Sequence, residues 1–287
     1  MDINSHALLN NGVQMPYFGL GVFRATAGEI TRSAVRTAIE YGYRMVDTAR
    51  AYCNEKSVGR GIKDSGVKRE DIFVTTKLWK DDFKNPRQGL MDSLERLQLD
   101  YIDLYLLHWP FLDYESAYLE LEKLQKEGLI RAIGVSNFKI HHLKRLKEIG
   151  ATVIPQVNQV ECHPECQENE LLDYCRKEGI LLEAYSPLGG QGRTLINDPR
   201  IFTIADYHHK TAAQVILKWN LQRGVAVIPK SVKFERILEN SQIFDFELTP
   251  GDMDIFADIN LNLKRGYDPD KINSRPEESY PKIIDED

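Results

Sequence analysis

The 287-residue sequence contains only four cysteines, at positions 53, 162, 166 and 175. So few thiols in a long chain argue against a disulfide-rich secreted domain and indicate a reducing compartment, so we expect a cytoplasmic protein. The stretch from Cys162 to Cys166 also contains His163. It lacks a second matched pair at zinc spacing, and the sequence therefore predicts no metal site.

Long apolar runs and an excess of positive charge are missing as well. No run approaches the roughly 20 apolar residues that cross a bilayer, and residues 1–6 lack the features of a signal peptide. The 37 Lys and Arg residues are outnumbered by 43 Asp and Glu residues, which gives a net charge of −6. Nucleic-acid binders are normally basic. We therefore expect neither a membrane protein nor a nucleic-acid partner, and nothing in the sequence argues against a monomer.

A glycine-rich phosphate loop is also absent. Gly19-Leu20-Gly21 begins like a dinucleotide fingerprint, but Arg24 stands where the third glycine would be. An open, doubly wound sheet would normally carry such a loop after its first strand. That architecture is therefore the less favoured alternative.

What the sequence does contain is a regular alternation of short apolar, β-rich runs and segments with helical spacing. Strands are predicted at residues 19–23, 44–47, 71–77, 102–108, 130–135, 155–159, 180–185 and 225–228. Each is followed by helical segments, at residues 29–41, 55–65, 86–99, 114–127, 139–149, 168–177, 199–221, 234–243 and 250–259. Such alternation implies parallel strands with right-handed crossovers. Eight units favour closure into an α/β fold, the (β/α)8 or TIM barrel.

The two ends of the chain add to this barrel. A barrel of this kind takes about 250 residues, so residues 1–287 are expected to form a single domain. Asn11-Gly12 is a strong signal for a two-residue turn and predicts an N-terminal β-hairpin over residues 6–18. Residues 264–287 are polar and rich in Pro, Asp and Glu, which predicts a C-terminal loop over the surface, at the rim formed by the carboxyl ends of the strands.

Ionisable side chains stand at successive predicted strand ends. Asp47, Lys77 and His108 end three consecutive strands, and Tyr52 follows the first of these ends. Taken singly, Asp47 could support a loop, Lys77 could extend along the surface and His108 could be a core histidine. Function in a parallel barrel sits at the carboxyl ends of the strands, so the recurrence favours a catalytic or binding site.

These four residue types suit the reduction of a carbonyl group. A phenol such as Tyr52 has a reference pKa near 10, and a cation such as Lys77 would lower that pKa. Asp47 can pair with Lys77, and His108 can donate a hydrogen bond to the carbonyl oxygen. No side chain donates a hydride, so a cofactor is required.

The motifs around these residues resemble those of the aldo-keto reductase family. The longest matching segments are residues 42–55, residues 154–164, and residues 228–231 with Arg236, Glu239 and Asn240. Shorter matches cover residues 107–110, 134–138 and 184–188. The resemblance runs from the hairpin to about Asn260 and is strongest to the bacterial branch that includes glyoxal, methylglyoxal and 2,5-diketo-D-gluconate reductases. It implies an NADPH-dependent reductase of small aldehydes, α-dicarbonyls or keto sugars, with Tyr52 as general acid beside Asp47, Lys77 and His108.

The resemblance also implies an extended cofactor across the rim of the barrel. The positions that would hold it are Gly21, Asp47, Ser136, Asn137, Gln159, Tyr185, Ser186, Leu188, Lys230, Ser231, Val232, Arg236, Glu239 and Asn240. Ser136, Asn137 and Gln159 would bind the nicotinamide carboxamide, and Tyr185 would stack on the ring. Ser186 and Leu188 would meet the pyrophosphate.

A small basic cluster in this acidic protein bears on the choice of cofactor. Lys230, Ser231 and Arg236 suit a 2′-phosphate, because Lys and Arg pair strongly with phosphate oxygens. NADPH is therefore predicted over NADH, with Glu239 and Asn240 facing the adenine. The alternative interpretation of this segment is a solvated helix start with incidental charge.

The substrate pocket is the least determined part. Phe23, Trp79 and Trp109 follow strand ends and could line it together with Tyr52 and His108, although aromatic residues also serve as packing. Val22-Phe23 departs from the Thr-Trp common in animal members of the family, which leaves the substrate open. A non-catalytic, NADPH-binding regulatory or structural protein on the same barrel is the alternative function.

Overall fold

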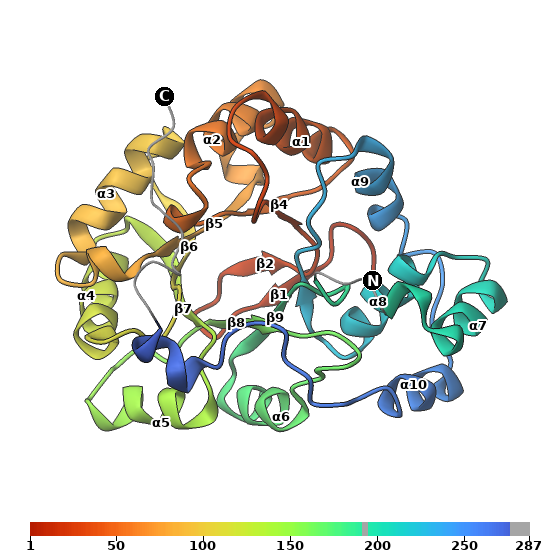
Figure 1. The fold of residues 1–287 in the computed structure, drawn as a ribbon. Coiled ribbons are helices and arrows are strands. Elements are labelled where there is room, and N and C mark those ends of the chain that lie inside the picture. The colour runs from red at the N-terminus through yellow and green to blue at the C-terminus, as the bar shows by residue number, and fades with distance from the viewer. Residues whose placement is uncertain (191–194, 276–287) are drawn as a thin grey trace.

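The computed structural model describes residues 1–190 and 195–275, and their core is one parallel sheet (Figure 1). In the described part of the chain this sheet has eight strands, which neighbour one another in chain order. They are β3 (Leu20–Gly21), β4 (Met45–Asp47), β5 (Phe73–Leu78), β6 (Ile102–Leu107), β7 (Ile130–Ser136), β8 (Val157–Glu161), β9 (Leu181–Tyr185) and β10 (Ala226–Val227).

The first and last strands meet and close the sheet. Bridges pair Phe18 with Val227 and Gly21 with Lys230, and the backbone N–H of Gly19 donates to the carbonyl of Val227 at 3.0 Å. The predicted (β/α)8 barrel is confirmed. Closure requires a glycine at position 21, because a Cβ there would lie 2.7 Å from the carbonyl oxygen of Ile228.

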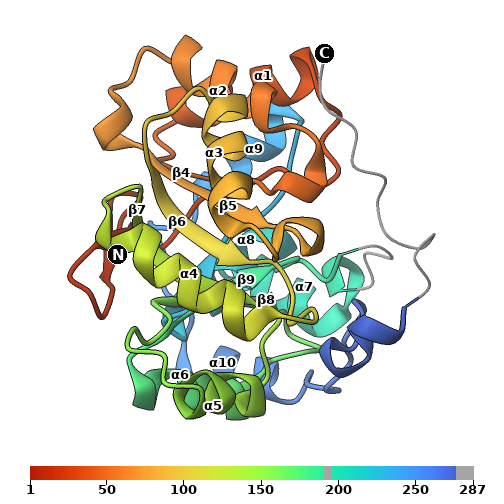
Figure 2. The ribbon, with the colours of Figure 1, turned by 90° about the vertical axis from the view of Figure 1, so that its left-hand side faces the viewer.

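Helices surround the barrel (Figures 1 and 2). They are α1 (Glu29–Glu40), α2 (Glu55–Asp64), α3 (Pro86–Leu97), α4 (Tyr114–Lys126), α5 (Ile140–Glu148), α6 (Asn169–Glu178), α7 (Pro199–Tyr207), α8 (Ala212–Gln222), α9 (Phe234–Ser241) and α10 (Pro250–Ala257). The segment predicted at residues 199–221 is two helices, because His209 adopts a left-handed conformation and Thr211 caps α8 by accepting from the backbone N–H of Gln214.

An N-terminal hairpin of β1 (His6–Leu8) and β2 (Gln14–Pro16) packs against one end of the barrel interior through Leu9 and Met15. The hairpin is confirmed, but the predicted two-residue turn is wrong. Leu9 donates to the carbonyl of Val13 at 2.9 Å, so the turn has three residues between this pair, the last of which is Gly12 with φ +85°. The strand register sets this length, because Leu8 lies opposite Gln14 and the next pair toward the turn is Leu9 and Val13.

The barrel interior is apolar at the hairpin end and polar toward the carboxyl ends of the strands. Met45, Phe73 and Val157 belong to the buried apolar cluster next to the hairpin. Because side chains alternate along a strand, the next inward positions lie nearer the rim, and these include the fully buried Gln159 and Glu183. The fold therefore keeps its buried polar groups together at one end.

The C-terminal segment crosses that rim, as expected from the sequence. Its described part runs to residue 275 and contains a short 3-10 helix, η5 (Pro269–Ser274). Asn273 donates to the carbonyl of Pro110 at 3.2 Å, which ties η5 to the loop after β6. The remainder of the predicted C-terminal loop, residues 276–287, lies outside the described residues. No helix in the described ranges is long and apolar enough to cross a membrane.

Replacing Gly21 by Ala tests the closure. The added Cβ would press on the Ile228 carbonyl, and we expect a loss of about 1–3 kcal/mol in the free energy of unfolding, measured by urea denaturation. Gly251→Ala is the matched control, because its nearest neighbour would be an ordinary contact at 3.8 Å from Thr249. Equal stability of the two variants would contradict a steric requirement at position 21.

Candidate active site

A buried ion pair lies at the rim, between Asp47 at the end of β4 and Lys77 in β5. The Lys77 ammonium donates to both carboxylate oxygens of Asp47 at 2.7 Å and to the carbonyl of Thr48 at 2.8 Å. The Lys77 side chain is 0% exposed and the Asp47 side chain is 2% exposed. Burial lowers the pKa of Lys77, and the neighbouring Asp47 opposes that shift. The N–H groups of the Lys77 ammonium therefore point at fixed acceptors, the Asp47 carboxylate and the Thr48 carbonyl.

Tyr52 ends the short 3-10 turn η1 (Arg50–Tyr52) that follows β4, and its hydroxyl lies 3.2 Å from the Lys77 ammonium. Burial raises the pKa of Tyr52 well above 10, and the negative charges of Asp47 and Glu183 raise it further. The sequence predicted a lowered pKa beside this cation, but the net shift in this structure is upward, because burial is the largest cause. Tyr52 instead keeps its proton throughout the neutral range, which is the state a proton donor needs.

His108 directly follows β6 and lies beside the phenol. The ring centroids of Tyr52 and His108 are 5.5 Å apart in an edge-on arrangement. Burial and the charge of Lys77 lower the pKa of His108 well below 6.5, so its imidazole is neutral. Its Nδ1 has no hydrogen-bond partner within the described ranges. A neutral imidazole carries one nitrogen that donates and one that accepts a hydrogen bond.

Aromatic side chains border these two rings. The ring of Phe23, half exposed at 51%, lies 5.0 Å from that of Tyr52. Buried Trp79 lies 5.2 Å from His108. Trp109 is partly buried and packs against the main hydrophobic core, and among the described residues it makes no ring contact with Tyr52 or His108. The structure thus brings the Phe23 ring against Tyr52 and the Trp79 ring against His108.

A second group of predicted residues lies at the ends of β7, β8 and β9. The side-chain amide of Asn137 donates to Ser136 at 3.0 Å and to the carbonyl of His108 at 3.1 Å. The hydroxyl of Tyr185 donates to the Asn137 oxygen at 2.8 Å. Asn137 can occupy this position because its backbone is left-handed, with φ +65°. Ser136, Asn137 and Tyr185 therefore form one hydrogen-bonded unit adjacent to His108.

Gln159 belongs to the same rim but lies deeper than predicted. Strand β8 continues to Glu161, two residues past the predicted end, so Gln159 lies within the strand. Its amide nitrogen donates to Asp47 at 2.8 Å and to Glu183 at 2.7 Å. The structure therefore connects the predicted cofactor residue Gln159 directly to the ion pair.

The remaining cofactor candidates lie along two loops. Ser186 and Leu188 follow β9 and are partly buried, whereas Lys230, Val232 and Arg236 are exposed near the start of α9. Neither Lys230 nor Arg236 forms an ion pair within residues 1–190 and 195–275. The Ser231 hydroxyl accepts from the backbone N–H of Lys233 at 3.0 Å.

Two further cofactor candidates, Glu239 and Asn240, are each restricted in the contacts that they could make with a ligand. Asn240 is buried. The Glu239 carboxylate already accepts from the Thr211 hydroxyl at 2.7 Å. Gly21 serves barrel closure, as described above, which gives its identity a structural reason independent of any ligand.

Sequence reasoning missed Glu183, a second carboxylate inside the barrel. It is fully buried, and burial together with the charge of Asp47 raises its pKa to about 8. The signal was present in the sequence: Leu181, Glu183 and Tyr185 alternate, so the glutamate shares the inward face of β9 with the tyrosine. The apolar residues on both sides of Glu183 make this strand resemble a continuous apolar run, so the charged residue within it was overlooked.

Glu161, at the end of β8, was missed as well. Its carboxylate accepts from the backbone N–H groups of Arg265 at 2.8 Å and Gly266 at 2.7 Å. Burial would raise the pKa of Glu161, but His163 and these two N–H donors together lower it. A Cβ on Gly266 would lie 2.9 Å from the Glu161 carboxylate and 3.3 Å from the Tyr185 hydroxyl. The C-terminal segment is thereby held directly over Tyr185.

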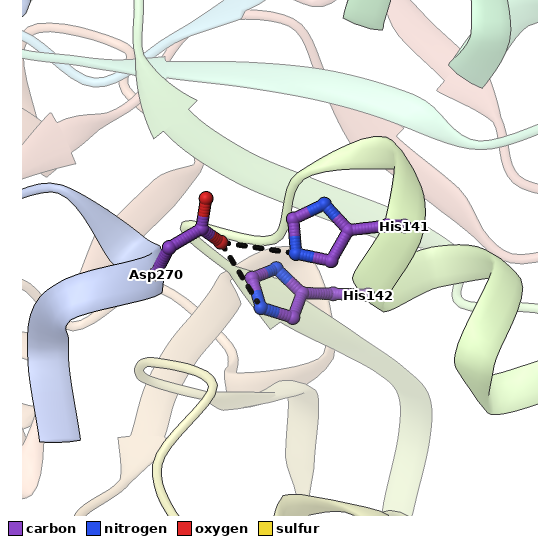
Figure 3. A group of neighbouring side chains, drawn as sticks. All are labelled: His141, His142 and Asp270. Carbon is purple, nitrogen blue, oxygen red and sulfur yellow. Dashed lines mark ion pairs between the residues drawn. The ribbon is translucent and has the colours of Figure 1, made fainter.

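The same segment is fixed to α5 and the residue before it by a group that we call the Asp270 cluster, made of Lys139, His141, His142, Asp268 and Asp270. Figure 3 shows three of these side chains, His141, His142 and Asp270. Asp270 lies 3.0 Å from Nε2 of His141 and 3.6 Å from Nε2 of His142. Lys139 bridges Asp268 and Asp270 at 2.6 and 2.7 Å.

Two imidazoles and a carboxylate also occur in metal sites. However, the backbone N–H of Lys139 donates to Nδ1 of His142 at 3.2 Å, and burial lowers the pKa of this histidine to about 4. The proton of the neutral ring therefore lies on Nε2, where a metal would need a lone pair. The cluster is better suited to holding the C-terminal segment than to binding a metal.

Comparison with known proteins agrees with the sequence motifs. The model described as "Aldo/keto reductase family" matches residues 18–261. The chain is 52% identical over 267 residues to the glyoxal reductase of Bacillus subtilis strain 168, covering 92% of this chain and 96% of that protein. It is 46% identical over 268 residues to methylglyoxal reductase DkgA of Escherichia coli strain K12, with 92% and 96% covered.

Among solved structures, the aldo-keto reductase of Bombyx mori in complex with NADP matches with a TM-score of 0.87 at 35% identity. The match covers 96% of this chain and 97% of the Bombyx mori chain. The resemblance inferred from the motifs is confirmed.

The ion pair can be tested through stability. Asp47→Asn leaves the Lys77 ammonium buried without a countercharge, and we expect a loss of about 3–5 kcal/mol in the free energy of unfolding, measured in urea. The double variant Asp47→Asn with Lys77→Met should lose less, because neither charge remains inside. A double variant as unstable as the single one would contradict a charge-based interaction.

Proposed function

The chain belongs to the aldo/keto reductase family and is an oxidoreductase that reduces carbonyl groups, and from this premise we propose that it reduces small aldehydes and α-dicarbonyl compounds with NADPH. The observation that carries the proposal is the contact between Lys77 and Tyr52, made beside a neutral His108 at the rim of the barrel. When bound, NADPH supplies the hydride. The protein must then supply the proton and orient the carbonyl.

Tyr52 is proposed as the proton donor. Its phenol is protonated at neutral pH because its pKa is raised. When it gives that proton to the carbonyl oxygen, the phenolate forms 3.2 Å from the Lys77 ammonium, which stabilises the new negative charge. Asp47 keeps Lys77 charged, and the neutral His108 donates an N–H to the carbonyl oxygen and orients it.

The residues present fit a nicotinamide cofactor. The side chains of Ser136, Asn137 and Gln159 gather next to His108 and Asp47, where a carboxamide needs donors and acceptors. Tyr185 lies in the same hydrogen-bonded unit. Lys230 and Arg236 are exposed cations on one loop and helix start, an arrangement that suits the 2′-phosphate of NADPH. A solved relative from Bombyx mori is a complex with NADP.

The substrate class rests on two supports. The relatives that are 52% and 46% identical are named glyoxal reductase and methylglyoxal reductase. In this chain the Phe23 and Trp79 rings stand beside Tyr52 and His108, and so border the place where the carbonyl would react. Apolar walls this close to the reacting group favour small carbonyl compounds.

Tyr52→Phe tests the proton donor. Without the hydroxyl, we expect turnover of methylglyoxal, followed by the loss of NADPH absorbance, to fall about 10²- to 10⁴-fold. NADPH should still quench the tryptophan fluorescence. Tyr207→Phe, at an exposed site on α7, is the control and should not change the rate. Turnover retained in Tyr52→Phe would defeat the mechanism, and a wild-type protein that binds but never oxidises NADPH would support the non-catalytic alternative.

Arg236→Ala tests the preference for NADPH. Loss of one charged contact to the phosphate should raise KM for NADPH roughly 10- to 100-fold and leave KM for NADH unchanged, because only NADPH carries the 2′-phosphate. Arg60→Ala, another exposed arginine on α2, is the control. An equal rise in KM for both cofactors would place Arg236 outside the phosphate site.

A further inference from the structure

A continuous row of polar contacts runs through the barrel beneath the reacting groups. Ser136, Gln159 and Glu183 are register partners on β7, β8 and β9. The Gln159 amide nitrogen donates to Glu183 at 2.7 Å and to Asp47 at 2.8 Å, and Asp47 accepts from Lys77. Glu183 is therefore joined to the proton donor through three intervening side chains.

The contacts of Gln159 fix the direction of its amide. Both N–H groups point at carboxylate oxygens, one on Asp47 and one on Glu183. A rotated amide would instead place its oxygen against the charged Asp47 carboxylate, which is unfavourable. The Gln159 oxygen is consequently the atom left to accept a hydrogen bond from the carboxamide NH₂ of a nicotinamide. Without Glu183, the second N–H would lose its partner and the amide could turn.

The charges of the interior constrain the state of Glu183. The titratable groups that face it are Asp47, Lys77 and Tyr52, and the far side is the apolar cluster that includes Leu181 and Val157. Lys77 already pairs closely with Asp47. A second ionised carboxylate would be buried without a cation of its own, which is strongly unfavourable. The other Glu183 oxygen has no partner within the described part of the chain.

We propose that Glu183 is a positioning residue that works in its protonated form, fixing the Gln159 amide for the nicotinamide and leaving the Lys77 charge to Tyr52. The inference rests on the proposed function. When Glu183 ionises, its charge competes for Lys77 and makes the Tyr52 proton harder to release. Since burial raises the pKa of Glu183 to about 8, kcat should decline as pH rises through that value.

Two substitutions separate the two roles. Glu183→Gln keeps an acceptor for the Gln159 amide but cannot ionise, so the alkaline decline of kcat should move to higher pH. Glu183→Met removes the acceptor, so the Kd of NADP⁺, measured by tryptophan quenching, should rise roughly 10-fold, the effect of one lost hydrogen bond. Glu183→Gln should restore that Kd. Glu122→Gln, a buried glutamate bound to Thr152 outside the barrel interior, is the control and should change neither quantity.

Infrared difference spectra test the protonation state without turnover. At neutral pH, the wild type minus Glu183→Gln should show the carbonyl stretch of a protonated carboxylic acid, shifted in D₂O and lost at alkaline pH. Absence of that band, an alkaline limb identical in wild type and Glu183→Gln, or an unchanged Kd in Glu183→Met would overturn the proposal. If the wild type fails to reduce methylglyoxal, the substrate class fails, while the infrared and binding measurements still decide the role of Glu183.

Discussion

An ammonium group enclosed in a barrel must be surrounded by oxygen atoms, and this requirement shapes the rim. Lys77 lies within 2.7 to 3.2 Å of two carboxylate oxygens, a carbonyl and a phenol. Transfer of such a charge from water is costly unless each donor is met, so the neighbouring strands are fixed relative to β5. The same burial shifts the pKa of the groups near Lys77: it raises the pKa of Tyr52 and Glu183 and lowers the pKa of His108, while Asp47 pairs directly with the ammonium.

The rest of the fold supplies the surroundings that make this ion pair effective. The hairpin and the apolar half of the interior exclude water from one side of the polar layer. Closure at Gly21 brings β10, with Lys230 just beyond it, beside β3. Asp47, Lys77, His108 and the cofactor candidates at the strand ends therefore lie on one rim, because parallel strands all end there. Within a low-dielectric interior, each hydrogen bond to Asp47 or Lys77 acts more strongly than it would in water.

The sequence was sufficient to predict the barrel architecture and most of the polar side chains at its rim. Strand periodicity and apolar runs placed Asp47, Lys77 and His108 within one residue of the observed strand ends, because these ends follow from local patterns. The direction of the Tyr52 pKa shift could not be obtained in this way, since it depends on burial and on Glu183, which is 131 positions away. The contacts of Glu161 with Arg265 and Gly266 join segments about a hundred positions apart and leave no local signal. The hairpin turn differed because its length is set by strand register.

The way the C-terminal segment is attached has a consequence for how such an enzyme diversifies. At Arg265 and Gly266 the segment is bound to Glu161 by its main chain, and every residue except proline carries the N–H that this bond needs. The side chain at position 265 can therefore change without loss of this bond, whereas Gly266 is restricted by crowding and Asp268, Asp270 and Asn273 make side-chain contacts of their own. A substitution at position 265 would thus change the surface at the mouth of the barrel and leave the main-chain attachment to Glu161 in place.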